Sequence, residues 1–302
     1  MIKIPFGLNI HNLIDDLRNF SWEAAEILLY YSSRLKSSEN RNDIIKTKLK
    51  EDPVTLADLK VNEMIIRRIN EKYKDVNWNI LSEENVKLGV DVRGQKSEWQ
   101  WVIDPLDGTK DFIQGTGNYA MHLALNYHQK PIVGVILIPE RDELWISYDK
   151  TVRCEKSNGS LKEIFLPREK NLDEMTFVSS KNHRNNILED LVKKLNFKKV
   201  IVMGSIGCKI ASIVRGESDI YISLSLPGQG CPKDWDFAAP EAILKASGGA
   251  ITDLYNKELI YNKKYFEQGG IIVATSNRDT HEVTCNQIKE IVREFNLFQI
   301  DT

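Results

Sequence analysis

The chain has 302 residues, 42% of them hydrophobic, which is enough for one large domain or two ordinary ones around a substantial core. Its 41 basic and 43 acidic side chains leave a formal net charge of -2, which argues against a broad electrostatic surface for a nucleic acid polymer or a membrane. The start, MIKIPFGLNIHNLIDDLRNF, has no basic region followed by an apolar core, and no later segment has the roughly 18 uncharged apolar residues of a membrane span. We therefore expect a cytoplasmic protein that handles any anionic ligand locally.

The cysteines are far apart in the sequence and form no CxxC pair. This spacing is typical of free thiols in a reducing compartment, and it disfavours zinc bound through cysteine. The four residues are Cys154, Cys208, Cys231 and Cys285.

The first half of the chain is predicted to combine two helices with a sheet. Residues 11–35 carry apolar side chains at helical spacing, and Thr55 is the predicted N-cap of a second helix with a buried stripe. Apolar or alternating runs predict strands at residues 78–81, 99–103, 120–127, 131–138 and 144–148. A polar zone at residues 158–170, with Gly159 and Pro167, is the predicted boundary between two domains, residues 1–160 and 161–302.

The second half alternates between strand and helix patterns, which is typical of α/β layering. Predicted strands lie at residues 176–179, 199–203, 218–224, 250–254 and 270–275. Predicted helices lie at residues 185–195, 209–215, 237–246 and 283–295, with a Pro/Gly loop at residues 226–233.

The stretch WVIDPLDGTKDF, residues 101–112, contains the residue types of a magnesium site. Mg2+ prefers oxygen ligands and takes a few carboxylates, leaving its other positions to water and substrate phosphate. Pro105 forces a turn, so the Asp104 and Asp107 carboxylates can converge while the Leu106 carbonyl offers a third oxygen. Gly108 then permits close backbone approach, Thr109 offers a hydroxyl that could orient a water molecule, and the amides of a following short helix could meet a phosphate oxygen.

A structural explanation exists for each acidic position taken alone. Asp, Pro and Gly are common turn formers, so the pentapeptide DPLDG is as consistent with a simple turn as with a metal site. Glu83, followed by Glu84, could be a solvated strand end, Asp236 an N-cap, and Asp58 the acidic partner of Thr55 in a capping box. For each acidic residue taken alone the structural explanation is favoured, but these explanations do not account for the occurrence of all these acidic positions in one sequence.

That combination resembles a known family. The segments DPVTLAD (52–58), LSEE (81–84), WVIDPLDGT (101–109) and WDFAAPEAILKASGG (235–249) occur in the order seen in the lithium-sensitive, magnesium-dependent phosphomonoesterase superfamily that includes the inositol monophosphatases. The resemblance covers most of the chain and implies an α+β fold, the layered α-β-α-β-α sandwich of the sugar phosphatases. Residues 204–221 and 230–253 are most similar to the 3'(2'),5'-bisphosphate nucleotidases, with inositol polyphosphate 1-phosphatases next.

The resemblance implies a role for each matching position. Glu83, Asp104 and the Leu106 carbonyl would bind one Mg2+ ion, and Asp104, Asp107 and Asp236 a second, with room near Glu83 for a weaker third. Asp58 and Thr109 would position and deprotonate the attacking water, with Glu83 linked to them. Glu84 is expected to be dispensable, and Asp234 is a rival to Asp236 as a ligand. The N-terminal half would thus carry most metal ligands, and the C-terminal half the last ligand and most of the substrate-binding residues.

Substrate contacts are also implied by the resemblance, in which Lys209 is the candidate cation for the phosphate that is not cleaved and His183, with Ser180, lies near the nucleotide. An alternative for Lys209 is an ordinary helix N-terminus with its ammonium in water, and an alternative for His183 is a solvated loop histidine. The spacing around Ser180 and His183 is one residue longer than in the family pattern. The predicted substrate-binding residues are Gly108, Thr109, Ser180, His183, Ser205 and Lys209.

The resemblance implies a lithium-sensitive, Mg2+-dependent enzyme of sulfur metabolism. It would hydrolyse the 3'-phosphate of adenosine 3',5'-bisphosphate to AMP, and also act on its sulfated relative. Alternatives are an inositol polyphosphate 1-phosphatase, an inositol monophosphatase-type sugar phosphatase, or an inactive metal or nucleotide sensor. The sensor is disfavoured because no acidic position of the catalytic set is missing. The expected partner is a small phosphate ester, and the expected state is a monomer or homodimer.

Overall fold

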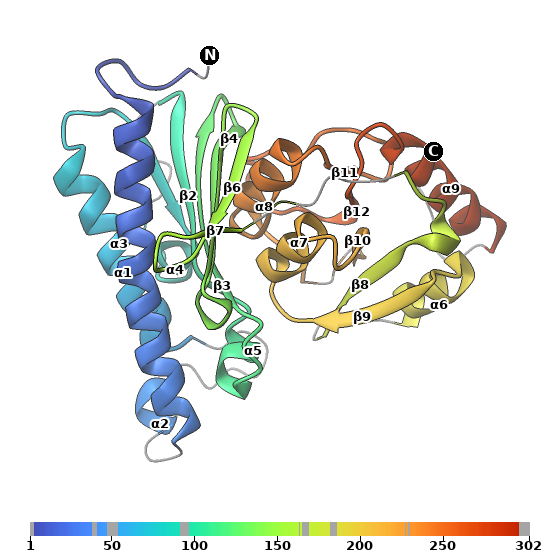
Figure 1. The fold of residues 1–302 in the computed structure, drawn as a ribbon, viewed down its shortest axis with the longest axis horizontal. Coiled ribbons are helices and arrows are strands. Elements are labelled where there is room, and N and C mark those ends of the chain that lie inside the picture. The colour runs from blue at the N-terminus through green and yellow to red at the C-terminus, as the bar shows by residue number, and fades with distance from the viewer. Residues whose placement is uncertain are drawn as a thin grey trace.

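The computed structural model describes residues 3–37, 41–46, 54–90, 97–162, 164, 169–181, 186–226, 228 and 230–295. The described chain forms five layers in the order helices, sheet, helices, sheet, helices (Figure 1). Buried side chains of the described residues form three hydrophobic cores between these layers. This arrangement confirms the predicted α-β-α-β-α sandwich.

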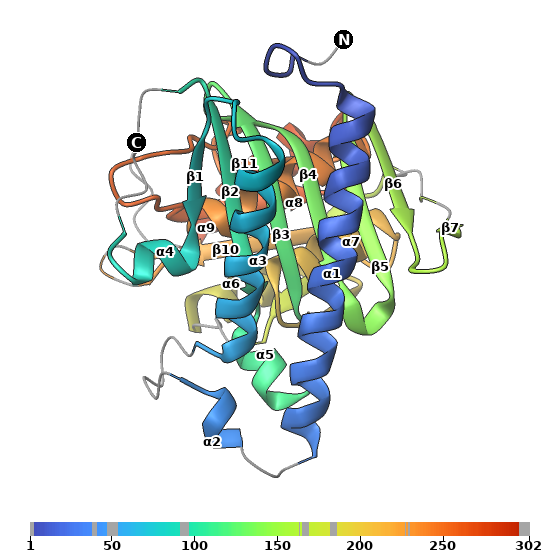
Figure 2. The same cartoon turned by 90° about the vertical axis from the view of Figure 1, so that its left-hand side faces the viewer.

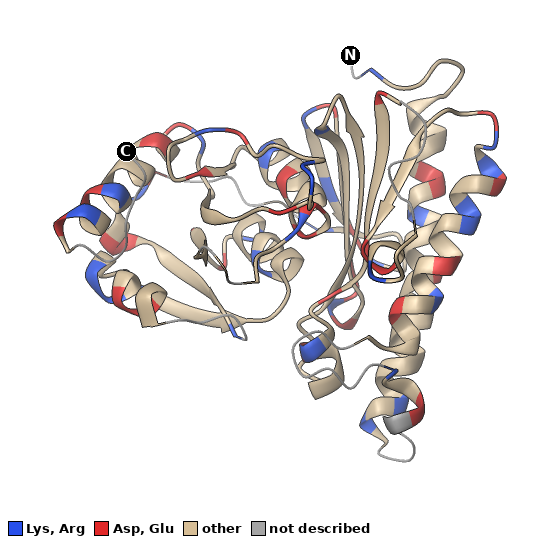
Figure 3. Cartoon of the chain, turned by 180° about the vertical axis from the view of Figure 1, so that it is seen from behind, with Lys and Arg blue, Asp and Glu red and all other residues tan. Residues whose placement is uncertain are grey.

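The first layer consists of α1 (Ile10–Lys36) and α3 (Leu56–Lys72), which run side by side across one face of the first sheet (Figure 2). Asn9 caps α1 by accepting hydrogen bonds from the amides of His11 and Asn12. The apolar stripes of both helices bury into one core with alternate residues of the sheet, which stabilises their docking. Acidic and basic residues are interspersed along both helices (Figure 3), in keeping with the small net charge.

Within the described residues, the first sheet contains seven strands in chain order, all antiparallel except for the parallel pair β1–β2. Strand β2 is buried throughout because helices cover both faces of the sheet. Trp101 and Ile103 face the outer helices, and Val102 faces the inner ones. The strands are β1 (Asn79–Ser82), β2 (Trp99–Asp107), β3 (Ala120–Tyr127), β4 (Lys130–Ile138), β5 (Glu143–Tyr148), β6 (Thr151–Glu155) and β7 (Leu161–Lys162).

Two inner helices, α7 (Ile206–Val214) and α8 (Asp234–Ala246), lie between the sheets (Figure 1). Helix α8 approaches β4 at Gly134, where a Cβ atom would lie 2.8 Å from the Ala239 carbonyl oxygen. The second sheet has the order β11-β12-β10-β8-β9, and α6 (Asn186–Leu195) and α9 (His281–Glu294) cover its outer face. Its strands are β8 (Thr176–Ser180), β9 (Lys199–Met203), β10 (Ile220–Ser225), β11 (Ala250–Asp253) and β12 (Gly270–Thr275).

Several element boundaries differ from the sequence expectation. Strand β2 continues to Asp107 rather than ending at residue 103, and α7 and α8 begin three residues earlier than expected, at Ile206 and Asp234. Strands β6 and β7 were not expected, because β6 has no clear apolar alternation and β7 has only two residues. The short helices are α2 (Arg41–Ile44), α4 (Glu83–Lys87) and α5 (Thr109–Gln114), with 3-10 turns at Pro139–Arg141 and Leu172–Glu174.

The first sheet ends at Lys162, and the second begins at Thr176. Helix α8 from the second half nevertheless packs against β3 and β4 of the first. Division into two domains at residue 160 therefore stays a prediction. None of the helices in the described ranges combines the length and apolarity that a membrane span requires.

Candidate active site

A bulge at the end of β2 brings two aspartates to one side of the first sheet. Asp104 pairs with His122 of β3 and Asp107 pairs with Ala120, so three steps along β2 match two steps along β3. In a regular strand, residues three apart point to opposite faces, and one extra residue reverses this. The Leu106 amide donates to Asp104 Oδ1 at 3.0 Å and holds the first carboxylate in a local turn.

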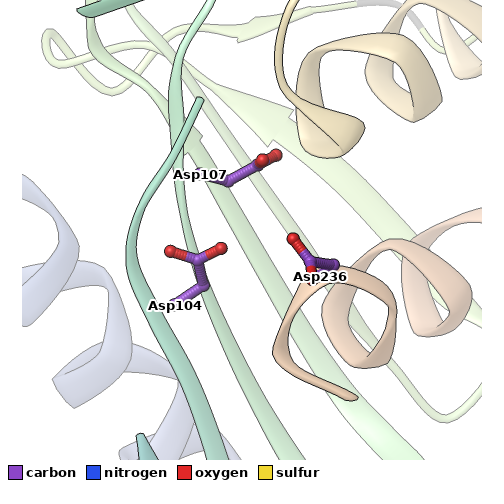
Figure 4. Close-up of side chains that lie close together, drawn as sticks. All are labelled: Asp104, Asp107 and Asp236. Atoms are coloured by element: carbon purple, nitrogen blue, oxygen red, sulfur yellow. The ribbon is translucent and has the colours of Figure 1, made fainter. Parts of the chain in front are cut away.

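Asp236, in the first turn of α8, completes a three-acid cluster. Carboxylate oxygens of Asp104, Asp107 and Asp236 lie within 4.8 Å of one another (Figure 4). One oxygen of Asp236, Oδ2, accepts from the Lys233 amide at 2.6 Å. Lys233 is therefore the N-cap of α8, and Asp236 is its capping-box partner in the first turn rather than the N-cap that the alternative explanation predicted. The β2 turn and the start of α8 therefore meet across the space between the sheet and the inner helices.

The charges in this cluster are poorly balanced by protein groups. Burial raises the pKa of Asp104 well above its usual value, and the carboxylates of Glu83, Asp107 and Asp236 raise it further. Burial also raises the pKa of Asp236, and Asp107 and Glu83 add to the effect. Burial acts in the same direction on Asp107, but His122, Lys209 and Ser205 outweigh it and lower its pKa to about 2. A buried cluster of hard oxygen donors with excess negative charge fits a divalent cation such as Mg2+.

Glu83 lies beside this cluster without being part of the three-acid group. It begins helix α4, where Lys87 Nζ lies 2.9 Å from Glu83 Oε1 and 3.3 Å from Glu84 Oε1. The Glu83 side chain is only 17% exposed, so it is not a solvated strand end. Its place as a metal ligand, with the Leu106 carbonyl, stays a prediction.

Asp58 connects the start of α3 to the β2 turn. Its Oδ2 accepts from the Thr55 amide at 2.8 Å and from the Thr55 hydroxyl at 2.5 Å, which forms the expected capping box. Its Oδ1 lies 3.2 Å from Thr109 Oγ1, which is also 3.1 Å from the Leu106 carbonyl oxygen. Burial is the main cause of a pKa for Asp58 raised to about 7, with the Thr55 hydrogen bond opposing it. The predicted Asp58–Thr109 pair is thus in contact beside the cluster.

Gly108, at the end of the β2 turn, lies against Ser205, the N-cap of α7. Gly108 has φ +88°, and a Cβ atom there would lie 3.0 Å from the Asn118 carbonyl and 3.2 Å from Ser205 Cβ. The Ser205 hydroxyl donates to Asp107 Oδ2 at 2.6 Å and accepts from the Cys208 amide at 3.0 Å, and the Gly207 amide also donates to Asp107 Oδ2. Ser205 therefore holds Asp107, and its predicted contact with substrate remains untested.

Lys209 points into the protein rather than into water, contrary to the alternative of an exposed lysine at a helix start. It is 3% exposed, and its ammonium lies 5.2 Å from the ring centre of Tyr221. Burial lowers its pKa, although Asp107 opposes this, and none of the described carboxylates forms an ion pair with it. Ser180, at the end of β8, interacts with the Tyr221 hydroxyl, whereas His183 lies outside the described residues.

The structure separates the two rival aspartates at the start of α8. Asp234 accepts from the Asn262 amide and from Gln268 Nε2, each at 2.6 Å. These bonds attach the loop before β12 to the helix and turn the Asp234 carboxylate away from the three-acid cluster, which contains Asp236.

Sequence reasoning missed three buried or partly buried side chains around the cluster. His122 interrupts the apolar run of β3 directly opposite Asp104, and a polar residue in a buried strand is a signal that could have identified it. Lys87 is the second missed residue, and its position four residues after Glu83, the spacing of a helical ion pair, is a signal that could have identified it. Asp111 is fully buried and accepts from Thr116 Oγ1, and a Cβ atom on Gly204 would lie 2.1 Å from its Oδ2, so only glycine fits there.

The amino-acid sequence of the chain matches a known protein family. Residues 12–293 match the inositol monophosphatase family. The chain belongs to that family. This membership confirms the family resemblance and makes the protein a phosphatase of the inositol monophosphatase type, with a three-acid cluster able to hold metal.

The relatives with similar sequences agree with that assignment. The chain is 30% identical over 258 residues to the 3'(2'),5'-bisphosphate nucleotidase CysQ of Aggregatibacter actinomycetemcomitans, covering 84% of this chain and 88% of the relative. It is 29% identical to the nucleotidase of the same name from Escherichia coli K12, covering 73% and 84%.

The fold is also similar to that of solved structures from other organisms. It is similar to an IMPase from Thermotoga maritima, with a TM-score of 0.71 at 20% identity, covering 94% of this chain and 99% of that one. The extragenic suppressor protein suhB of Bartonella henselae gives 0.73 at 19% identity, covering 94% and 99%.

Proposed function

We propose that this protein is a Mg2+-dependent 3'(2'),5'-bisphosphate nucleotidase that converts adenosine 3',5'-bisphosphate to AMP and also accepts its sulfated relative. The observation that carries this proposal is the 30% identity, over most of both chains, to a protein named as such a nucleotidase. The buried Lys209, which suits a substrate with a second phosphate, supports it.

The proposed metal ligands come from three segments of the chain. Asp104, Asp107 and Asp236 would hold one Mg2+ ion, and Glu83, Asp104 and the Leu106 carbonyl a second, with a weaker third near Glu83. When bound, Mg2+ neutralises phosphate charge and lowers the pKa of water, which is the chemistry that phosphoryl transfer to water requires. The acidic cluster has the hard oxygen donors for this role.

Asp58 and Thr109 are proposed to handle the proton of the attacking water. The Thr109 hydroxyl can donate to Asp58 Oδ1 and accept a hydrogen bond from the water, which fixes the water's position. A carboxyl group with a pKa of about 7 is suited to accept a proton near neutral pH. No covalent intermediate with serine or cysteine is needed, in keeping with burial that raises the pKa of the Cys208 thiol to about 12.

Lys209 is proposed to bind the phosphate that is not cleaved. A buried ammonium without an ion-pair partner among the described carboxylates is costly, and a phosphate oxygen would restore its balance of charge. A bisphosphate substrate would therefore use Lys209, whereas a monophosphate ester would not.

A substrate panel tests the proposal. We expect Mg2+-dependent release of phosphate from adenosine 3',5'-bisphosphate, and much slower release from inositol 1-phosphate, inositol 1,4-bisphosphate and fructose 1,6-bisphosphate. Lys209→Met should raise KM for the nucleotide by at least about 10-fold, because a lost charge-assisted hydrogen bond costs roughly 1.5–3 kcal/mol. Equal or faster turnover of an inositol or fructose ester would overturn the nucleotide assignment.

A further inference from the structure

His122 is a fully buried histidine that links two proposed metal-ligand segments. It lies on β3 opposite Asp104, on the face of the sheet that meets the inner helices. Its Nδ1 lies 3.2 Å from the Trp235 carbonyl oxygen, which can only accept a hydrogen bond, so Nδ1 carries the hydrogen. Its Nε2 lies 3.2 Å from Asp107 Oδ2, at the distance of an ion pair but not at the angle of a hydrogen bond.

The surroundings leave the ring little freedom. A Cβ atom on Gly207 would lie 2.2 Å from His122 Nε2, so the first turn of α7 packs directly on the imidazole. The ring thus touches the end of β2 through Asp107, the start of α7 through Gly207, and the start of α8 through Trp235. Trp235 immediately precedes Asp236, so the contact on α8 is one residue from a member of the acidic cluster.

We propose that His122 is a positioning residue that sets the distance between the Asp107 and Asp236 carboxylates. The two aspartates belong to different layers of the fold, and the planar imidazole is a rigid spacer between their segments. His122 is not itself a proposed ligand of the metal, and it acts through Asp107 and the Trp235 backbone. The inference rests on the proposed metal site and adds a residue that fixes its geometry.

Metal titration of the intact protein without substrate tests this role. Calorimetric titration with Mg2+ and with Mn2+ should show affinity reduced about 10- to 100-fold in His122→Ala, the usual effect of losing a group that orients a ligand. An asparagine amide lies near the Nδ1 position and can still donate to the Trp235 carbonyl, whereas a glutamine amide can reach Asp107. His122→Asn and His122→Gln should therefore each restore part of the affinity, and they keep the test valid if His122→Ala does not fold.

His281 provides a matched control. It is also fully buried, and its two ring nitrogens lie 2.8 Å from the hydroxyls of Thr252 and Thr275, on the far side of the second sheet. His281→Gln should lower stability without changing metal affinity. Unchanged affinity in His122→Ala, or an equal loss in His281→Gln, would overturn the inference while leaving the proposed function standing. A wild-type protein that bound neither ion would overturn both.

Discussion

Asp58, Asp104 and Asp236 each support local backbone structure and face the proposed site. A carboxylate has two oxygens, so one can cap a helix or close a turn while the other points elsewhere. Asp58 uses Oδ2 for its capping box and Oδ1 for Thr109, and Asp236 uses Oδ2 for the Lys233 amide. The capping and metal-site interpretations of these residues are therefore compatible rather than competing.

Removing the negative charge of Asp104 should change the unfolding temperature of the protein. Its raised pKa means that the folded protein disfavours the ionised carboxylate, so the isosteric Asp104→Asn removes repulsion. We expect the variant to unfold in EDTA at the same or a higher temperature than wild type, with Mg2+-dependent turnover reduced at least about 100-fold. Thermal unfolding and phosphate release would be measured on the same preparations.

Glu84→Gln is the control for this substitution. Glu84 is buried and paired with Lys87, and lies outside the three-acid cluster. The variant should keep most of its turnover, as the sequence expectation of a dispensable Glu84 requires. Near-normal turnover in Asp104→Asn would contradict the role of Asp104 as a shared ligand.

Among the elements, short irregularities place the site. The bulge in β2 puts Asp107 on the same side as Asp104, and Gly134 lets α8 approach β4 closely enough for Asp236 to join them. Helices α7 and α8 lie between the two sheets, so their first turns can contribute to a site at the carboxyl end of β2. Without the bulge in β2, the Asp107 carboxylate would point to the opposite face of the sheet from Asp104. A larger residue in place of Gly134 would move α8, and Asp236 with it, away from β4.

His281, the first residue of helix α9, should make the free energy of unfolding depend on pH in the acidic range. Burial, followed by the charge of Lys245, lowers the pKa of this histidine from 6.5 to about 4. The unfolded chain therefore binds a proton at His281 at higher pH than the folded protein does. The contribution of neutral His281 to the free energy of unfolding is fully present above pH 6.5 and is lost as the pH falls towards 4. Urea unfolding should show wild type losing about 2–3 kcal/mol more between pH 7 and 4 than His281→Gln. Parallel pH profiles for the two proteins would exclude this contribution.

For the whole molecule, the acidic cluster joins the two halves of the chain. Asp104 and Asp107 belong to the first sheet, whereas Asp236 belongs to a helix that follows most of the second. An ion bound to all three is bound only by the folded protein, because the unfolded chain does not hold these distant residues together.

Divalent cation should therefore raise the unfolding temperature of the entire protein. At a Mg2+ concentration 100 times the dissociation constant the stabilisation is about 2.7 kcal/mol, which corresponds to an increase of several degrees. Calorimetric or fluorescence melting across a Mg2+ series should show a concentration-dependent shift that EDTA reverses and that Asp104→Asn lacks. A melting temperature independent of Mg2+ would argue against binding at this cluster.

The family, the layered fold and all three members of the acidic cluster were predictable from the amino-acid sequence, through the family resemblance that four short segments carry. The individual helices and strands are predicted by short-range signals, which are the apolar period of each element and its caps. The same local signals missed β6 and β7, whose formation depends on pairing with β5 and β6.

Which of these side chains meet depends on the packing of the layers. Asp234 and Asp236 share the first turn of α8, and contacts with Asn262 and Gln268 direct the first away from the cluster. His122 could not be connected to Trp235 from sequence, because their contact depends on how β3 packs against α8. Residues far apart in the chain carry no local pattern that records their distance in space, so the packing of the layers decides which of them form a site.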